Sequence, residues 1–336
     1  MRIPILVALA FIVSSPHQGY SQTPASCPNN AIFLALEDEV RGYPARANGQ
    51  SQPCQILKGP KTTLSTARAI AISAHGFLHI AQFLTNGTAN LFPPDSHGDA
   101  SPSRTIVTDT NDLIAIAIDS HITDYIMSNR GRPNAILVVP NGATAPIGSF
   151  NDPDLQSAWG LAVDAENNLL VAGYDVNGAA TIDTFATSAN NTAPARIRRL
   201  QGPATGLFSN FSAFFANTMA IALDPSSQEL YVYNTNADST QIQVSVFPAL
   251  ANGNVSPTRV ISGPSTHLGV PGFLGTSKIS VSSDGRLFDA EPNDRILVFA
   301  PGASGDVAPS QIIQDSTIGS AQVDQGGVAV RSCACQ

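Results

Sequence analysis

Short apolar segments alternate with polar turn residues along most of the chain, and no stretch repeats its apolar residues at helical spacing. The clearest segments alternate a small residue with Ile, Leu or Val. Six segments of this kind occur, at 69–72, 115–118, 160–163, 220–223, 278–281 and 327–330. Because successive side chains of a strand point to opposite faces, the pattern predicts six equivalent β-strands.

A second landmark is a proline that precedes a short apolar or β-branched run. It occurs at Pro53, Pro102, Pro146, Pro194, Pro257 and Pro309. Subtraction gives intervals of 49, 44, 48, 63 and 52 residues, the period of a four-stranded propeller blade. Proline has no N–H for a ladder, so this strand is expected at the outer edge of each blade.

One repeat unit is clearest between residues 276 and 313. Strands are expected at 278–281, 287–288, 295–299 and 309–313, with turn signals at Ser283-Asp284-Gly285 and Pro292-Asn293-Asp294 between them. Asp164, Asp224 and Asp284, each just after a first strand, are expected to be turn residues that accept local N–H bonds.

The two ends of the chain each supply part of one repeat. Residues 31–36, 39–43 and 54–57 provide a second, third and fourth strand, and residues 326–331 provide a first strand. We therefore predict an all-β fold: a six-bladed β-propeller of four-stranded antiparallel blades, with the last blade shared between the N- and C-termini.

The run from Ile296 to Ile313, I-x-V-F-x-P-G-A-x-G-x-x-A-P-x-x-I-I, is degenerate at 242–261, 90–106 and 40–57. Together with the strands at 160–164 and 220–224, it resembles exported bacterial NHL-repeat-like propellers. The resemblance covers nearly everything from Ala31 to Arg331 and implies a six-bladed propeller. Such propellers include binding modules, lactonases and lyases, so the resemblance does not select an activity.

The first 26 residues have the pattern of a signal peptide. Arg2 precedes an apolar stretch from Ile3 to Val13 that is too short to span a bilayer, and small residues near 21–26 suit cleavage. We expect a secreted or periplasmic protein with a single domain at 27–336. Lipid attachment to Cys27 is an alternative, although Pro24-Ala25-Ser26 lacks the expected Leu-type residue.

Charge is sparse, at 12% of residues, and acidic in balance, with a net charge of −8. Binding to nucleic-acid phosphates needs clustered Lys and Arg, so nucleic acid is not an expected partner. No second long apolar segment occurs, so no membrane span is expected. We expect a monomer that binds an unknown protein or small molecule.

Four cysteines in an exported chain suggest disulfides. They lie near the two ends, at Cys27, Cys54, Cys333 and Cys335. If the last blade is shared, all four approach one face of it. We predict two bridges that join the termini, Cys27–Cys333 and Cys54–Cys335, in preference to the crossed pairing.

Propellers generally bind ligands over the central channel, on the face that carries the loops into each first strand, here named the entry face. The opposite face, with the turns from first to second strands, is named the turn face. Entry-face candidates for ligand binding are Arg68, Asp112, Trp159, Lys278, Glu291, Phe211 and Phe214. Lys278 replaces residues that are small in the other repeats. It is either a member of a buried ion pair or a ligand group at the channel mouth.

The longest repeat interval contains Phe208, Phe211, Phe214 and Phe215. This insertion is either a plug that packs over the channel or an apolar lid or partner patch.

A calcium-dependent lactonase would need several converging oxygen ligands. Candidates are Asp109, Asp112, Asp154, Asn234, Glu291 and Asp294, but Arg68 and Lys278 would oppose a cation there. The five histidines after residue 26 are not spaced as zinc ligands. We therefore predict no catalytic residues, metal or cofactor, and an exported non-catalytic scaffold that binds on its channel face; the alternative is a metal-dependent, lactonase-like hydrolase.

Overall fold

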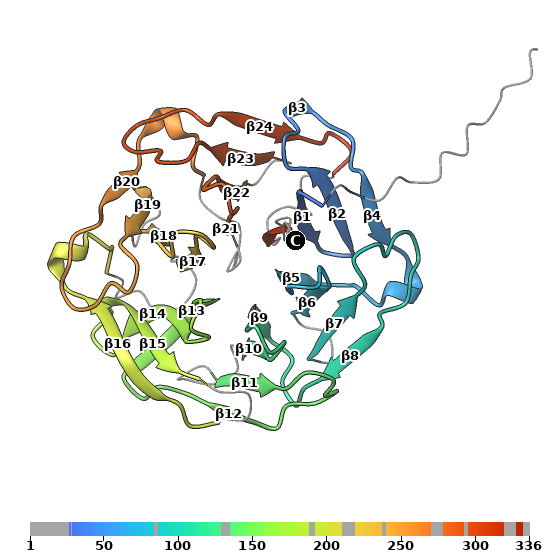
Figure 1. Cartoon of the computed structure of the whole chain (residues 1–336), viewed down its shortest axis with the longest axis horizontal. Coiled ribbons are helices and arrows are strands. Elements are labelled where there is room, and N and C mark those ends of the chain that lie inside the picture. Colours follow the sequence, from blue (N-terminus) through green and yellow to red (C-terminus); the bar gives the residue numbers. More distant parts are fainter. Residues whose placement is uncertain are drawn as a thin grey trace, which may run out of the picture.

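The structure is a computed structural model that describes residues 27, 29–83, 87–128, 135–187, 192–209, 219–236, 240–269, 278–291, 295–318 and 327–331. Six four-stranded antiparallel sheets surround a central axis (Figure 1). Apart from three 3-10 turns, all the regular structure in these residues is β-strand. The six-bladed propeller predicted from the repeats is confirmed.

Within each blade the first strand lies nearest the axis and the fourth at the rim. Blade 1 contains β5 (Ala67–Ile72), β6 (Leu78–Gln82), β7 (Thr88–Phe92) and β8 (Arg104–Val107). Blade 2 contains β9 (Leu113–Ile118), β10 (Asp124–Ser128), β11 (Ala135–Val139) and β12 (Gly148–Phe150). Blade 3 contains β13 (Leu155–Val163), β14 (Leu169–Asp175), β15 (Ala180–Ala186) and β16 (Ala195–Gln201). Blade 4 contains β17 (Met219–Leu223), β18 (Leu230–Thr235), β19 (Ile242–Phe247) and β20 (Arg259–Ile261). Blade 5 contains β21 (Ile279–Val281), β22 (Leu287–Glu291), β23 (Arg295–Phe299) and β24 (Gln311–Gln314).

The sixth blade, named the closing blade, joins the two ends of the chain. It contains β25 (Val328–Arg331), β1 (Ala31–Leu36), β2 (Glu39–Pro44) and β4 (Gln55–Lys58) in that order from the axis. Ala31 lies opposite Arg331, and Leu34 lies opposite Val328. The shared last blade predicted from the incomplete repeats is confirmed.

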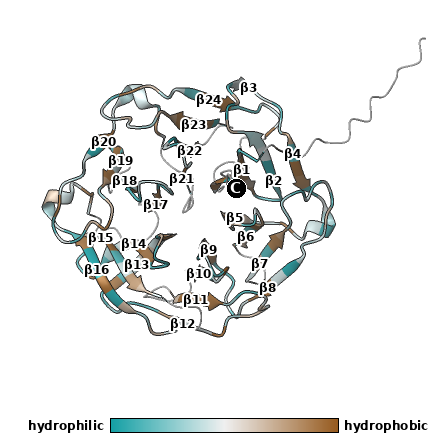
Figure 2. Cartoon of the chain, in the orientation of Figure 1, coloured by the Kyte–Doolittle hydropathy of each residue, from teal (hydrophilic) through white to brown (hydrophobic). Residues whose placement is uncertain are grey.

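Hydrophobic residues follow the strands of every blade (Figure 2). Side chains of each first strand alternate between the two inter-blade cores on either side of it. In β5, for example, Ile70 packs into the core with the closing blade, whereas Ala69 packs into the core with blade 2. The apolar side chains of the inner strands therefore pack between neighbouring blades and hold them together.

The outer strands are not simple free edges. Leu57, Leu200 and Ile261, at the ends of β4, β16 and β20, each form a parallel bridge to a loop glycine of the next blade. β24 pairs in the same way with β3 (Gly49–Gln50). Four of the blade junctions are thus joined by parallel main-chain pairing at the rim, which covers edges that would otherwise be open to another chain.

Three of the connections between blades share the sequence G-P-x-T-x-L, at 59–64, 202–207 and 263–268. Each folds as a short 3-10 turn: η1 (Pro60–Thr62), η2 (Pro203–Thr205) and η3 (Pro264–Thr266). An Asp or Asn of the next blade accepts the N–H that follows the proline, at 2.6–2.7 Å, in the pairs Lys61–Asp99, Ala204–Asn254 and Ser265–Asp306. The leading glycines have φ between 127° and 138°, which disfavours other residues.

The predicted disulfide pairing is wrong. Cys27 is bonded to Cys54, with a Cα–Cα distance of 5.0 Å. The bridge crosses β2 at Gly42, where an added Cβ would lie 2.7 Å from the Cys27 sulfur. Cys27 thus needs to cross only the one strand between β1 and β4, whereas the prediction took it toward the C-terminal strand. Cys333 and Cys335 lie outside the described residues.

The predicted signal peptide, residues 1–26, also lies outside the described residues. In the part of the chain that the structure describes, no helix has the length and apolar character needed to cross a membrane.

Candidate functional site

The channel along the axis is lined by residues of the six inner strands and has a volume of about 210 Å³. Nearly all of these residues are apolar, with Ser280 the one exception. Each inner strand is the last strand of its sheet on that side, so its inner backbone edge has no neighbouring strand. Because the side chains turn toward the inter-blade cores, the channel presents main-chain N–H and C=O groups, which bind water or polar ligand atoms.

A larger cavity, about 650 Å³, opens where the channel reaches the turn face. Its wall contains Asn29, Ile72, Ser73, Ala74, His75, Gly76, Pro94, Asp95, Pro225, Val281, Ser283, Val330 and Arg331. These residues come from the closing blade and from blades 1, 4 and 5. The cavity is named the turn-face cavity, and its size is that of a typical small-molecule pocket.

The position of this cavity follows from the shared blade. Blades 1 to 5 have covalent turns between first and second strands. Side chains link the turns of blades 2 to 5 to one another. The links are Ser120 N to Asn167 Oδ1 at 2.8 Å, Ala165 N to Gln228 Oε1 at 2.9 Å, and Ser226 Oγ to Ser283 O at 2.8 Å. The closing blade has no covalent turn there because the chain ends meet instead, and the cavity lies beside that gap.

The cavity combines an apolar floor with a polar rim. Ile72, Val281 and Val330 also line the channel and form the inner part of the wall. Exposed His75 and Asp95 stand at the rim. Arg331 is fixed in the wall because its guanidinium donates to the carbonyl oxygens of Pro94, at 3.2 Å, and Cys27, at 3.0 Å. The site thus offers opposite charges around an apolar base.

On the entry face, two of the predicted candidates meet in one cluster between blades 4 and 5. Lys278 Nζ lies 2.7 Å from Glu291 Oε1 and 2.9 Å from Asp289 Oδ1. It also donates to the carbonyl oxygen of Ala290 at 2.7 Å and lies 5.0 Å from the ring centroid of Tyr233. Lys278, Asp289 and Glu291 are each 1% exposed or less. Of the two roles weighed for Lys278, the structure shows the buried ion pair.

The pKa values of the two carboxyl groups in this cluster shift in opposite directions. Burial raises the pKa of Asp289 far above its usual value, and the neighbouring Glu291 adds to the effect against the attraction of Lys278. Burial also opposes ionisation of Glu291, but Lys278 outweighs it and lowers the pKa of Glu291. The pKa of Lys278 is raised because attraction to both carboxylates outweighs its desolvation. The favoured state is a charged Lys278–Glu291 pair beside a protonated Asp289.

Asp289 and its role were missed by the sequence reasoning. The only available signal was its spacing of two residues from Glu291, which places both side chains on one face of a strand.

The other entry-face candidates do not join this cluster. Arg68 is 2% exposed and lies over the ring of Phe83, 4.4 Å from its centroid. Burial lowers the pKa of Arg68 to about 10, against the attraction of Glu37. Asp112 is half-buried and its main chain bridges to Phe83.

Trp159 is half-buried and packs between the cores on both sides of blade 3. Phe211 and Phe214, with most of the phenylalanine insertion, lie outside the described residues.

The described oxygens considered for calcium do not converge on one point. Asn234 Oδ1 accepts the N–H of Phe208 at 2.6 Å, Asp154 pairs with Arg196 at 3.0 Å, and Glu291 pairs with Lys278. Asp294 lies outside the described residues. Among the residues that the structure describes, no three His, Cys, Asp or Glu side chains are grouped to hold a metal ion.

One histidine forms a buried contact that the sequence did not reveal. His79 Nδ1 lies 2.5 Å from Asp124 Oδ1, and Arg104 contacts the other oxygen of Asp124 at 3.0 Å. His79 and Asp124 are 1% and 0% exposed. This trio joins blades 1 and 2 and has no access to a substrate, so we interpret it as structural.

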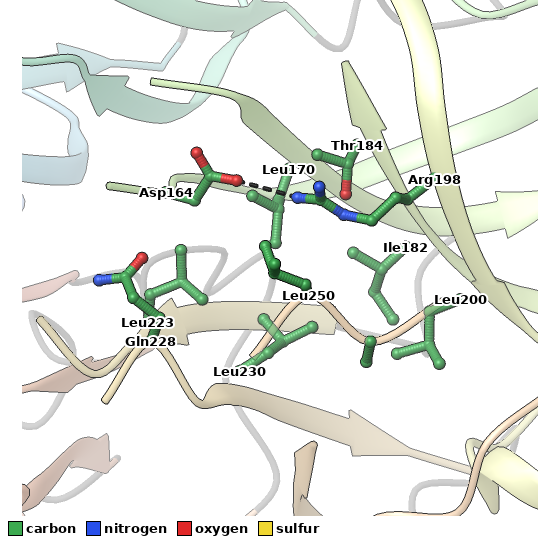
Figure 3. Close-up of a pocket in the computed structure, with 11 residues that line it drawn as sticks. Asp164, Leu170, Ile182, Thr184, Arg198, Leu200, Leu223, Gln228, Leu230 and Leu250 are labelled. Carbon is green, nitrogen blue, oxygen red and sulfur yellow. Dashed lines mark hydrogen bonds and ion pairs between the residues drawn. The ribbon is translucent and has the colours of Figure 1, made fainter. Parts of the chain in front are cut away.

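Two further hollows lie away from the channel. A cavity of about 20 Å³ between blades 3 and 4 is bordered by Asp164 and Arg198, which pair at 2.9 Å (Figure 3). It has room for about one water molecule. A groove of about 520 Å³ at the rim of blade 2 includes the exposed side chains of Val107 and Ile147.

No family model matches the chain, and a search of curated proteins finds no match. Among solved structures, a protein of unknown function from Bacteroides caccae is similar, with a TM-score of 0.55 and 8% identity over 90% of this chain and 98% of that one. Hydrazine synthase of Kuenenia stuttgartiensis is similar over 80% of this chain and 72% of that one, with a TM-score of 0.50 and 11% identity. At these identities the likeness shows the β-propeller fold alone.

Proposed function

We propose that this protein is an exported, non-catalytic β-propeller that binds a ligand at the mouth of its central channel. The observation that carries the proposal is the turn-face cavity of about 650 Å³, which continues into the channel. It has an apolar floor and a few polar groups at its rim, the usual composition of a binding pocket. The sequence led us to expect ligand binding on the entry face, whereas the ligand site proposed here is at the turn-face end of the channel.

Export is supported by the pattern of residues 1–26 and by the Cys27–Cys54 disulfide, because disulfides persist in oxidising compartments. The disulfide also occupies the thiol that lipid attachment to Cys27 would require. We therefore favour a secreted or periplasmic protein without a lipid anchor.

A ligand-observed NMR screen with a library of small polar and amphipathic molecules tests the proposal. Ala74 is exposed at the cavity wall, so Ala74→Trp fills the mouth without disturbing the core. Ser304→Trp is the matched control, because Ser304 is exposed in the rim loop of blade 5 and does not line the cavity. Binding that Ala74→Trp abolishes and Ser304→Trp keeps supports the site. Binding that survives Ala74→Trp rules it out.

The metal-dependent hydrolase remains the alternative function. A panel of lactones and esters, with and without added Ca²⁺, distinguishes it from a scaffold. Turnover that Ca²⁺ stimulates and Asp112→Ala abolishes would replace the scaffold proposal.

A further inference from the structure

The buried cluster on the entry face fastens the connection into blade 5. Tyr233 donates a hydrogen bond from its hydroxyl group to the carbonyl oxygen of Gly269, at 2.7 Å. Glu291 accepts the N–H of the same residue. A Cβ on Gly269 would overlap Glu291 Oε2. Both main-chain groups of Gly269 are therefore held by side chains of blades 4 and 5.

The same attachment occurs at two other junctions, with uncharged side chains. Gly269, Phe208 and Ser65 are each the sixth residue after the glycine of a G-P-x-T-x-L turn. The N–H of Phe208 donates to Asn234 Oδ1 at 2.6 Å, and that of Ser65 donates to Gln82 Oε1 at 3.0 Å. Blade 5 has a carboxyl group, Glu291, where blades 1 and 4 have an amide.

Blade 5 also adds a second carboxyl group, Asp289, two residues before Glu291. The corresponding residues before Gln82 and Asn234 are the apolar Ile80 and Val232. Lys278 is the ion-pair partner of both carboxyl groups. Neither oxygen of Asp289 accepts a hydrogen bond of good geometry from the described residues. Two ionised carboxylates beside one ammonium would leave a net negative charge in a fully buried site, which is strongly unfavourable.

We propose that Asp289 and Glu291 share one proton and that loss of this proton, as pH rises, releases Gly269 from its attachment between blades 4 and 5. The structure thus contains a pH-sensitive latch at one junction and pH-insensitive versions of it at two others. This inference concerns the entry face and does not depend on the turn-face cavity.

The direction of the pH dependence follows from the pKa of Asp289, which is raised in the folded protein. A raised carboxyl pKa stabilises the fold at low pH, and the contribution is lost as pH rises through the folded value. Ionisation of Tyr233 cannot cause this loss of stability, because burial and the nearby carboxylates raise the pKa of Tyr233 well above its usual value. Arg295 is the charged residue opposite Glu291 in the β22–β23 register.

Amide hydrogen exchange of the full chain, followed by NMR from mildly acidic to mildly alkaline pH, tests the latch. After correction for intrinsic exchange, protection of the Gly269 amide should fall about tenfold per pH unit once the pair ionises. The amides of Phe208 and Ser65 serve as internal controls and should keep constant protection. Constant protection at Gly269, or an equal fall at all three amides, would overturn the proposal.

Two variants remove the shared proton while keeping an acceptor for Gly269. Asp289→Asn leaves the Lys278–Glu291 pair intact, and Glu291→Gln reproduces the amide found at Gln82. Protection of Gly269 should become independent of pH in both variants. A fall that persists in a folded Asp289→Asn protein contradicts the latch, and if neither variant folds, the three amides of the unmodified protein still decide the question.

Discussion

The guanidinium of Arg331 donates a hydrogen bond to the carbonyl oxygen of Cys27, at 3.0 Å, across a sequence separation of 304 residues. The same guanidinium lies 4.9 Å from the ring centroid of Phe33 on β1. The last described residue thus packs against the first described residue and the first strand. Closure of the ring depends on this contact and on the β25–β1 ladder, rather than on a disulfide between the termini.

Deletion of residues 326–336 should lower the thermal midpoint and reduce solubility. It removes β25 and exposes the inner edge of β1, including the buried Ile32 and Phe33. Each buried aliphatic side chain that is lost contributes about 1.5–3 kcal/mol. Deletion of 332–336 alone is the control, since it keeps β25. If the longer deletion melts like the full protein, the closure is not needed for stability.

Non-reducing peptide mapping should recover a Cys27–Cys54 peptide. Replacing both cysteines with serine should lower the free energy of unfolding by about 3–4 kcal/mol, since the bridge closes a separation of 27 residues. Urea denaturation measures the loss. A peptide that links Cys27 or Cys54 to Cys333 or Cys335 would contradict the pairing seen in the structure.

Substitution of Gly263 by Ala should destabilise the rim connection between blades 4 and 5. An added Cβ would lie 2.5 Å from Asp306, and φ at Gly263 is 127°. We expect a loss of about 2–4 kcal/mol from strain and overpacking. Gly302→Ala is the matched control: its φ is 74°, but nothing lies within 4 Å of the added Cβ, so about 1 kcal/mol is expected.

The Gly263 result has an internal check. Asp306→Gly removes the Cβ, Cγ and Oδ1 atoms that the new methyl would meet, so the double variant should be less destabilised than the sum of the two single changes. If the two losses of stability simply add, the contact between Gly263 and Asp306 is not the cause of the destabilisation.

Replacement of Lys278 by Met should cost about 3–5 kcal/mol, because it leaves two carboxyl groups in a buried site without their cation. Neutralising the partners as well, in Lys278→Met with Asp289→Asn and Glu291→Gln, should recover part of the loss. Urea denaturation of both variants at neutral pH shows whether the triple variant is the more stable of the two. A single variant as stable as the triple variant would mean that the ion pairs contribute little.

Acidification should weaken the contact between the closing blade and blade 5 at Asp315. Burial of this carboxyl group opposes ionisation, but hydrogen bonds from Thr317, Tyr43 and Arg41 outweigh it and lower its pKa. The resulting stability is present above the unfolded value, about 4, and is lost as pH falls through the folded value. Asp315→Asn should therefore destabilise the protein at neutral pH by about 1–3 kcal/mol and reduce the acid dependence of its thermal midpoint.

The sequence alone determined the fold because the fold is repetitive and local. Each blade is specified by alternating side chains, turn residues and a proline at the outer strand, all within about fifty residues. The turn role expected for Asp164 and Asp224 is one such local property: each accepts N–H groups two to four residues ahead. The incomplete repeats at the two ends fixed the closing blade in the same way.

The tertiary structure alone decided which distant groups meet. The sequence did not show that Asp289 pairs with Lys278, because the two residues become neighbours only when β21 and β22 pair. The disulfide was mispredicted because strand order alone did not show that Gly42 lets Cys27 cross β2 to Cys54. The turn-face cavity arises where a covalent turn is missing, and the channel exposes main-chain edges although its sequence is apolar. Such features depend on packing between blades, and local alternation of residues does not encode it.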